Sequence, residues 1–109
     1  MALALNNYVT IPVQATTATV GIYTAPAGYN SVVLCAQATN LDTVSRDVTL
    51  SLERDAVTIH SAYKKPVASY DTIELTTGRY TLNPGDQFKL SCSSNGVVDV
   101  TISVLETLI

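Results

Sequence analysis

Apolar and polar side chains alternate along several stretches of the chain, most regularly in Val98-Asp99-Val100-Thr101-Ile102-Ser103-Val104. A period of two places successive side chains on opposite faces of an extended strand, so one face can be buried while the other meets solvent. The same alternation occurs in residues 48–52 and 88–92, and no helical stripe of comparable length is present. The pattern predicts an all-β, antiparallel domain.

Turn-forming residues separate the apolar runs at short, regular intervals, which is typical of a β-sandwich or a barrel. We predict eight or nine strands in two sheets packed face to face, as an antiparallel β-sandwich of jelly-roll-like form. A chain of 109 residues has room for one core, so residues 1–109 form a single domain, with residues 1–6 as a candidate N-terminal arm. The predicted strands are residues 7–13, 19–24, 31–40, 46–54, 57–63, 73–75, 79–82, 87–93 and 97–106.

Proline, glycine and asparagine indicate how several of these strands end. Pro12 confines the first strand to a sheet edge or places it at the end of the strand, and Lys64-Lys65-Pro66 is expected to end the fifth. Asn83-Pro84-Gly85-Asp86 predicts a type II turn. Asn95-Gly96 predicts a type I′ hairpin between the last two strands. Residues 67–73 are expected to be a loop, with room for one short helical turn.

The strand at residues 31–40 is the most apolar and is apolar on both faces. Such a strand is either central and covered twice or part of an interface. We expect Val33 and Cys35 to face away from the core, whereas Cys92 faces the core on its own strand. Two thiols on different faces cannot form a disulfide, so both are predicted to be free. The residues expected on the core face are Val32, Leu34, Ala36 and Ala38.

Charged residues make up only 14% of the chain, and the net charge is −3. A small protein normally covers its surface with charge, so this composition suggests that other protein covers part of the surface. The alternative is a monomer with a neutral surface rich in Thr and Ser. Lys64 and Lys65 are the only adjacent basic residues, which argues against a nucleic acid or an anionic membrane as a partner. Residues 1–5 lack the basic start of a signal peptide, so we expect synthesis in a cytosol without export by that route.

Residues that could carry chemistry are few. His60 is the only histidine, and no nucleophile motif accompanies it. The carboxylates fall at turns or at outward strand positions, where solvated side chains are normal, although Asp42 and Asp47 could contribute to a calcium site. We therefore predict no catalytic residue, no cofactor and no metal, and hence a protein that is not an enzyme.

Six tyrosines and apolar chain ends are the remaining distinctive features. Tyr23 and Tyr80 lie within strands and are expected at the core or its edge, whereas tyrosines near turns and loops can anchor a partner or stack on a sugar. The apolar ends can either close the domain's own core or pack on neighbouring copies. The candidate interface residues are Leu3, Leu5, Tyr29, Tyr63, Tyr70, Leu108 and Ile109.

Four segments in this order carry a resemblance to a known group of proteins: residues 22–28 (Ile-Tyr-Thr-Ala-Pro-Ala-Gly), 38–40 (Ala-Thr-Asn), 82–86 (Leu-Asn-Pro-Gly-Asp) and 100–106 (Val-Thr-Ile-Ser-Val-Leu-Glu). Together they resemble small virion structural proteins of tailed bacteriophages, including cyanophages. The resemblance implies a β-sandwich or jelly-roll protein on a particle surface, without catalytic residues.

Two functions follow from this resemblance as alternatives. The first is a capsid decoration (cement) protein in the virion. It would assemble in the host cytoplasm as a homo-oligomer such as a trimer, and it would bridge copies of the major capsid protein or other virion proteins. The second is a tail, fibre or baseplate module that binds a host-surface glycan or neighbouring tail proteins. The short chain favours the first alternative.

Overall fold

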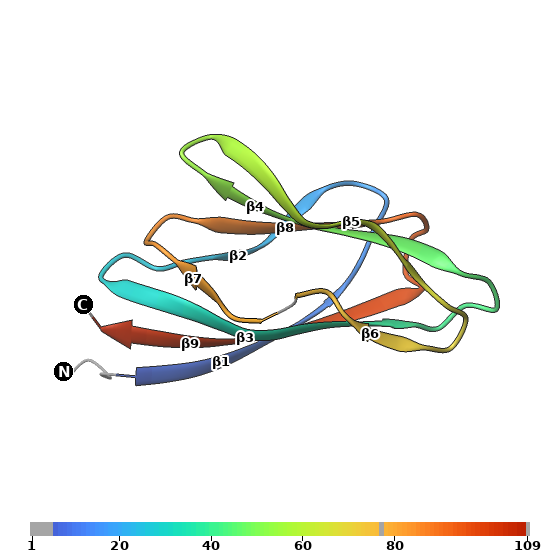
Figure 1. Cartoon of the computed structure of the whole chain (residues 1–109), viewed down its shortest axis with the longest axis horizontal. Helices are drawn as coiled ribbons and strands as arrows, with labels where there is room; N and C mark the ends of the chain where they lie inside the picture. Colours follow the sequence, from blue (N-terminus) through green and yellow to red (C-terminus); the bar gives the residue numbers. More distant parts are fainter. Residues whose placement is uncertain (1–5, 77, 109) are drawn as a thin grey trace.

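A computed structural model of the chain describes residues 6–76 and 78–108 (Figure 1). These residues form no helix, and therefore none that is long and apolar enough to cross a membrane. Their nine strands are β1 (Asn6–Gln14), β2 (Val20–Thr24), β3 (Tyr29–Asn40), β4 (Arg46–Arg54), β5 (Val57–Val67), β6 (Thr72–Glu74), β7 (Tyr80–Leu82), β8 (Gln87–Cys92) and β9 (Val98–Leu108).

The strands form two antiparallel sheets that pack face to face as two layers (Figure 1). Sheet A has the order β1-β9-β3-β6, and β7 also pairs with β3. Sheet B has the order β2-β8-β4-β5. The predicted all-β sandwich is confirmed. Pro12 lies in β1, at the edge of sheet A, where a residue without an N–H is tolerated.

Strands from the first half of the chain pair with strands from the second half in a nested order. β1 pairs with β9, β2 with β8, β3 with both β6 and β7, and β4 with β5, all antiparallel. β6 and β7 pair with different parts of the same edge of β3, so together they take the place of one strand. The chain is therefore a long hairpin that is folded over into two sheets. This is the arrangement of a jelly roll.

Side chains from the inner faces of both sheets fill the space between them. The period-two pattern of β9 places Val98, Val100, Ile102 and Val104 in this core, each at most 1% exposed. Sheet B contributes Phe88 and Leu90 from β8, together with Val48 and Leu50 from β4. Alternating strands from two sheets thus bury one common apolar layer, as the sequence pattern predicts.

A bulge in β3 changes which of its residues face the core. The pairing of β3 with β9 shifts between Val33 and Cys35, so Leu34 is an extra residue that reverses the alternation. Val33 is therefore buried, so its predicted position away from the core is wrong, as are the predicted core positions of Val32 and Leu34. Beyond the bulge, Ala36 and Ala38 are buried as predicted.

The two cysteines lie as predicted. Cys35 pairs with Ser103 on the outward side of sheet A and is half-buried, whereas Cys92 faces the core. Both thiols are free.

The fifth strand continues past the predicted stop at Lys64-Lys65-Pro66 and ends at Val67. Lys64 has a positive φ of 46°, and the pairing of β4 with β5 shifts on either side of Leu50. The strand continues through these irregularities, and Pro66 is tolerated because β5 lies at the edge of sheet B. The next loop contains a turn closed by a hydrogen bond from Asp71 N to Ala68 O (3.1 Å), not a helical turn.

The two turns predicted from proline and glycine have different outcomes. At the first, Gly85 has a φ of 91° and Asp86 N donates to Asn83 O over 3.0 Å, as a type II turn requires. The second prediction is wrong. Gly96 has a positive φ but Asn95 does not, and β8 and β9 belong to different sheets. The Asn95-Gly96 segment therefore crosses from one sheet to the other instead of closing a hairpin.

Candidate assembly surfaces

The structure places the predicted interface residues in separate parts of the molecule. Tyr29 and Leu108 pair across β3 and β9, at the end of the sandwich where β1 begins and β9 ends (Figure 1). Tyr70 lies in the loop between β5 and β6, where Asp71 O accepts a hydrogen bond from Asn40 N at the other end of β3. Tyr63 lies on the edge strand β5. Leu3, Leu5 and Ile109 lie outside the described residues.

The outward face of sheet A carries an apolar row that the sequence analysis did not identify. Directly paired residues of neighbouring strands point to the same side of a sheet. Tyr8 of β1 pairs with Leu105 of β9, which pairs with Val32 of β3. Tyr8 is 75% exposed, and the other two side chains are half-buried. Tyr8, Leu105 and Val32 thus form an apolar row across three strands, called the outer row below.

The rest of this outward face has little charge. Among the described strand residues of sheet A, Asp99 and Glu74 are the charged side chains that the pairing places there. Thr39 and Thr72 bind each other through their hydroxyl groups, whose oxygens lie 2.9 Å apart. The other outward positions are Asn6, Thr10, Pro12, Gln14, Asn30, Cys35, Gln37, Thr81, Thr101, Ser103 and Thr107. A surface of this kind can be covered by protein without the cost of removing water from many ions.

The outward face of sheet B differs, because it carries ion pairs and ring contacts. Lys89 of β8 forms an ion pair with Glu53 of β4. On β5, the rings of His60 and Tyr63 meet edge to face, with centroids 4.8 Å apart. The Lys64 ammonium group lies 5.4 Å from the centroid of the Tyr63 ring. The two outer surfaces of the sandwich are therefore chemically distinct.

A polar cluster connects the two sheets near the start of β1 and the end of β9. Glu106 of β9 is buried and accepts hydrogen bonds from Tyr23 Oη (2.5 Å) and Asn7 Nδ2 (3.1 Å). Because Tyr23 gives its proton to Glu106, Ser31 Oγ is the donor in its own 3.0 Å bond to Tyr23 Oη. Burial, together with the bond to Glu106, raises the pKa of Tyr23 to about 12. The buried Glu106 carboxylate is thus stabilised by two hydrogen-bond donors, Tyr23 and Asn7.

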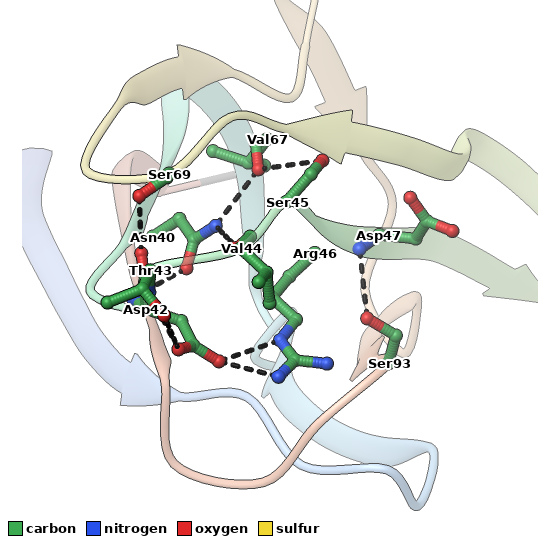
Figure 2. Close-up of polar contacts among 10 residues, drawn as sticks. All are labelled: Asn40, Asp42, Thr43, Val44, Ser45, Arg46, Asp47, Val67, Ser69 and Ser93. Carbon is green, nitrogen blue, oxygen red and sulfur yellow. Dashed lines mark hydrogen bonds and ion pairs between the residues drawn. The ribbon is translucent and has the colours of Figure 1, made fainter.

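At the opposite end, the loops after β3 and β5 are joined by hydrogen bonds (Figure 2). Asn40 Nδ2 donates to Val44 O (2.8 Å) and Val67 O (3.0 Å), and Ser69 Oγ donates to Asp42 O (2.8 Å). Arg46 binds the Asp42 carboxylate through Nε and Nη2, at 2.9 and 2.6 Å, and thereby lowers the pKa of Asp42. These hydrogen bonds hold the loop after β3 against the loop after β5.

The predicted calcium alternative drew on Asp42 and Asp47, and the structure does not bring these carboxylates together. Asp42 faces Arg46, whereas the Asp47 side chain points away from it (Figure 2). Across residues 6–76 and 78–108, no group of three or more His, Cys, Asp or Glu side chains is placed to hold a metal ion. The Asp42 side chain therefore supports the loop through Arg46.

No protein-family model matches the chain, and no curated protein matches it in sequence. Solved structures with a similar fold include a chain of the acid-stable capsid of Helicobacter pylori bacteriophage KHP30, with a TM-score of 0.59 and 11% identity over 96% of this chain and 89% of that one. A chain of the IBDV viral particle has a TM-score of 0.57 and 9% identity over 96% of this chain. This chain spans 31% of the length of that viral chain.

A third similar structure comes from Bacillus endospore appendages, described as disulfide-linked pili. It has a TM-score of 0.54 and 16% identity over 100% of this chain and 97% of that one. At these identities the likeness shows the fold. The fold of this chain is therefore one found in viral capsid proteins and also in a pilus protein.

Proposed function

We propose that this chain is a structural protein of a bacteriophage virion, and that it decorates and cements the capsid. The observation that carries this proposal is the outer row on the charge-poor face of sheet A. Exposed apolar side chains on a surface with few charges are typical of the centre of a protein–protein interface. The jelly-roll fold, which the KHP30 capsid chain shares, also supports this role.

In this proposal the outward face of sheet A contacts the major capsid protein, other virion proteins or further copies of this chain. One contact through a few apolar side chains is weak, but a protein that bridges neighbouring capsomers gains avidity from several contacts at once. A homo-oligomer such as a trimer would present several outer rows together. Two free thiols agree with assembly in a reducing host cytoplasm.

The predicted interface residues near the chain ends are part of the same proposal. Tyr8 follows residues 1–6, the candidate N-terminal arm that contains Leu3 and Leu5. Leu105 and Leu108 both lie on β9, and Leu108 pairs with Tyr29 on the side of sheet A opposite to the outer row. We expect these ends to pack on neighbouring subunits beside the outer row. Tyr63 and Tyr70 belong to other surfaces.

A pilus subunit is the second candidate, favoured by the almost complete mutual coverage with the Bacillus appendage protein. Its pili are described as disulfide-linked. Here the Cys92 side chain is buried and only Cys35 reaches an outer surface, half-buried. A chain of subunits joined by disulfides through these two cysteines would require both thiols to be accessible. The cysteine positions therefore favour the capsid role.

The number of copies per particle separates a capsid role from a tail role. Quantitative mass spectrometry of purified particles should find hundreds of copies if the protein covers the capsid. A count of a few dozen or fewer would instead support a tail, fibre or baseplate module. Absence from the particle would overturn both virion roles.

The cement role is tested by particle stability. Particles that lack this protein should release their packaged DNA at a lower temperature than complete particles. Adding back the purified protein should restore the higher release temperature. Equal release temperatures with and without the protein would contradict a cement role.

A further inference from the structure

A small polar pocket lies on the outward side of sheet B, opposite to the outer row. It has a volume of about 280 Å³. This is close to the lower end of the range for small-molecule sites, roughly 300–1,000 Å³. Strands β4, β5 and β8 and the residue after β8 line it, through Asp47, Thr49, Lys64, Ser91, Cys92 and Ser93.

Two backbone hydrogen bonds fix the hydroxyl groups of this pocket. Lys64, whose φ is 46°, donates its N–H to Thr49 Oγ1 over 3.0 Å. Asp47 N donates to Ser93 Oγ over 3.0 Å (Figure 2). A hydroxyl oxygen that accepts one hydrogen bond still has its own proton to donate. Thr49 and Ser93 are therefore held in place as donors for a ligand, and Ser91 adds a third hydroxyl.

The charged groups of the pocket form no ion pair among the described residues, although the Lys64 ammonium lies over the Tyr63 ring. In the part of the chain that the structure describes, the Asp47 carboxylate and the Lys64 ammonium form no ion pair with each other or with another residue. One is an acceptor and the other a donor of up to three hydrogen bonds, and their charges sum to about zero. This combination suits a neutral ligand that both donates and accepts hydrogen bonds.

An aromatic ring stands beside these polar groups. Tyr63 directly precedes Lys64, whose ammonium lies 5.4 Å from the ring centroid, and the tyrosine is 61% exposed. The edge-to-face contact with His60 helps to fix the orientation of the ring. An exposed, oriented ring offers an apolar platform next to a cluster of hydrogen-bonding groups.

We propose that this pocket binds a neutral sugar residue of a glycan, with the sugar hydroxyls bound by Asp47, Lys64 and the Ser and Thr side chains. The less polar C–H face of the sugar would pack on Tyr63. Binding itself does not depend on the capsid role. If sheet A docks on the capsid as proposed above, the pocket on sheet B faces away from the capsid. This part of the inference rests on the proposed function.

Nuclear magnetic resonance titration of the isotope-labelled chain tests this site. Glucose, galactose, N-acetylglucosamine and rhamnose are added separately, each into the millimolar range. At least one should produce saturable shifts of the amides of Lys64, Ser91 and Ser93, without comparable shifts in β1. If none of the four sugars shifts these amides, the proposal is overturned.

Two variants with matched controls locate the binding. Asp47→Asn should weaken binding by about tenfold, because it removes a charged acceptor of sugar hydroxyls. Tyr63→Ala should weaken it by about three- to tenfold, because it removes the platform. Asp55→Asn makes the same charge change in the β4–β5 turn, and Tyr8→Ala removes an exposed tyrosine from sheet A. Both controls should leave binding unchanged.

Equal losses in the variants and their controls would contradict the assignment of this pocket. Since Asp47 and Tyr63 are both exposed, neither substitution should prevent folding. Each variant therefore tests the site separately. Loss of sugar binding with unchanged attachment to particles would leave the capsid role standing. Loss of attachment with unchanged sugar binding would leave the pocket standing.

Discussion

At the scale of single residues, the Tyr23–Glu106 pair shows how this sandwich accommodates a buried carboxylate. Glu106 continues the inward positions of β9 after Val104 and is only 8% exposed. A charge in that position is tolerated when donors satisfy it, and here Tyr23 and Asn7 do so. The period-two pattern predicts that Glu106 points inward. The pattern does not predict its partner, because Tyr23 belongs to a strand of the other sheet.

Replacing Tyr23 by Phe should lower the free energy of unfolding by about 1–3 kcal/mol, because Glu106 would lose one of its two donors. Urea denaturation of the wild type and the variant measures this difference. Tyr80→Phe is the matched control, since Tyr80 also packs against the core but no hydrogen bond involves its hydroxyl among the described residues. Equal losses in the two variants would contradict the role of the Tyr23 hydroxyl.

The same residue predicts a loss of stability at alkaline pH. The pKa of Tyr23 is raised from 10.0 to about 12 in the folded protein, so the folded state keeps a proton that the unfolded state releases. Its contribution to stability is therefore complete below about pH 10 and declines as the pH rises toward 12. Thermal unfolding between these pH values should show a smaller decline in Tyr23→Phe than in the wild type. Parallel curves would contradict this assignment.

At the scale of elements, the turn between β7 and β8 is supported by contacts from distant strands. The Asp86 carboxylate is buried and accepts hydrogen bonds from Asn83 N (2.8 Å) and from Arg54 Nε (2.8 Å). Arg54 thereby lowers the pKa of Asp86. Ala25, in the β2–β3 turn, donates its N–H to Asp86 O over 2.8 Å. The β7–β8 turn is thus bonded to the β2–β3 turn through Ala25 and to the end of β4 through Arg54.

Gly85→Ala should therefore destabilise the protein by about 1–2 kcal/mol, since a residue with a Cβ is strained at a φ of 91°. Gly85→Asn is the matched comparison, because Asn tolerates positive φ better and should cost less. Urea denaturation of both variants gives the two values. A loss that is equal in both would indicate a cause other than backbone strain.

The errors of the sequence predictions are errors of pairing between elements. Local alternation located the strands, but the phase of β3 depends on the bulge opposite β9. Asn95-Gly96 has the composition of a hairpin turn, yet it joins strands of different sheets. The outer row could not be identified without the strand order β1-β9-β3, which places Tyr8, Leu105 and Val32 side by side. In contrast, the Asn83–Asp86 turn is local and was predicted correctly.

At the scale of the whole molecule, the two outer surfaces of the sandwich suit different tasks. The outward face of sheet A is charge-poor and carries the outer row, whereas that of sheet B carries the Lys89–Glu53 ion pair and the polar pocket. A subunit that uses one face for assembly keeps the other available for a ligand. The low charge content of the sequence indicated contact with protein, and the structure locates the charge-poor surface on one side.

Tyr8→Glu should abolish attachment to particles without unfolding the protein, because it places a charge in the most exposed part of the outer row. Co-sedimentation of the purified variant with particles that lack the protein measures attachment. Thr58→Glu adds the same charge to an exposed position on sheet B and is the control. If Tyr8→Glu attaches as well as the control, the outer row is not the interface.

The nested pairing of the strands also determines when this protein can fold during synthesis. The β4–β5 hairpin is the first pair whose two strands both leave the ribosome, and β1 must wait for β9. Each pairing closer to the termini closes a longer loop of chain, which slows folding. β9 lies between β1 and β3 in sheet A, so until β9 emerges neither of these strands has this hydrogen-bonding partner. Sheet A can therefore be completed only after β9 has been synthesised.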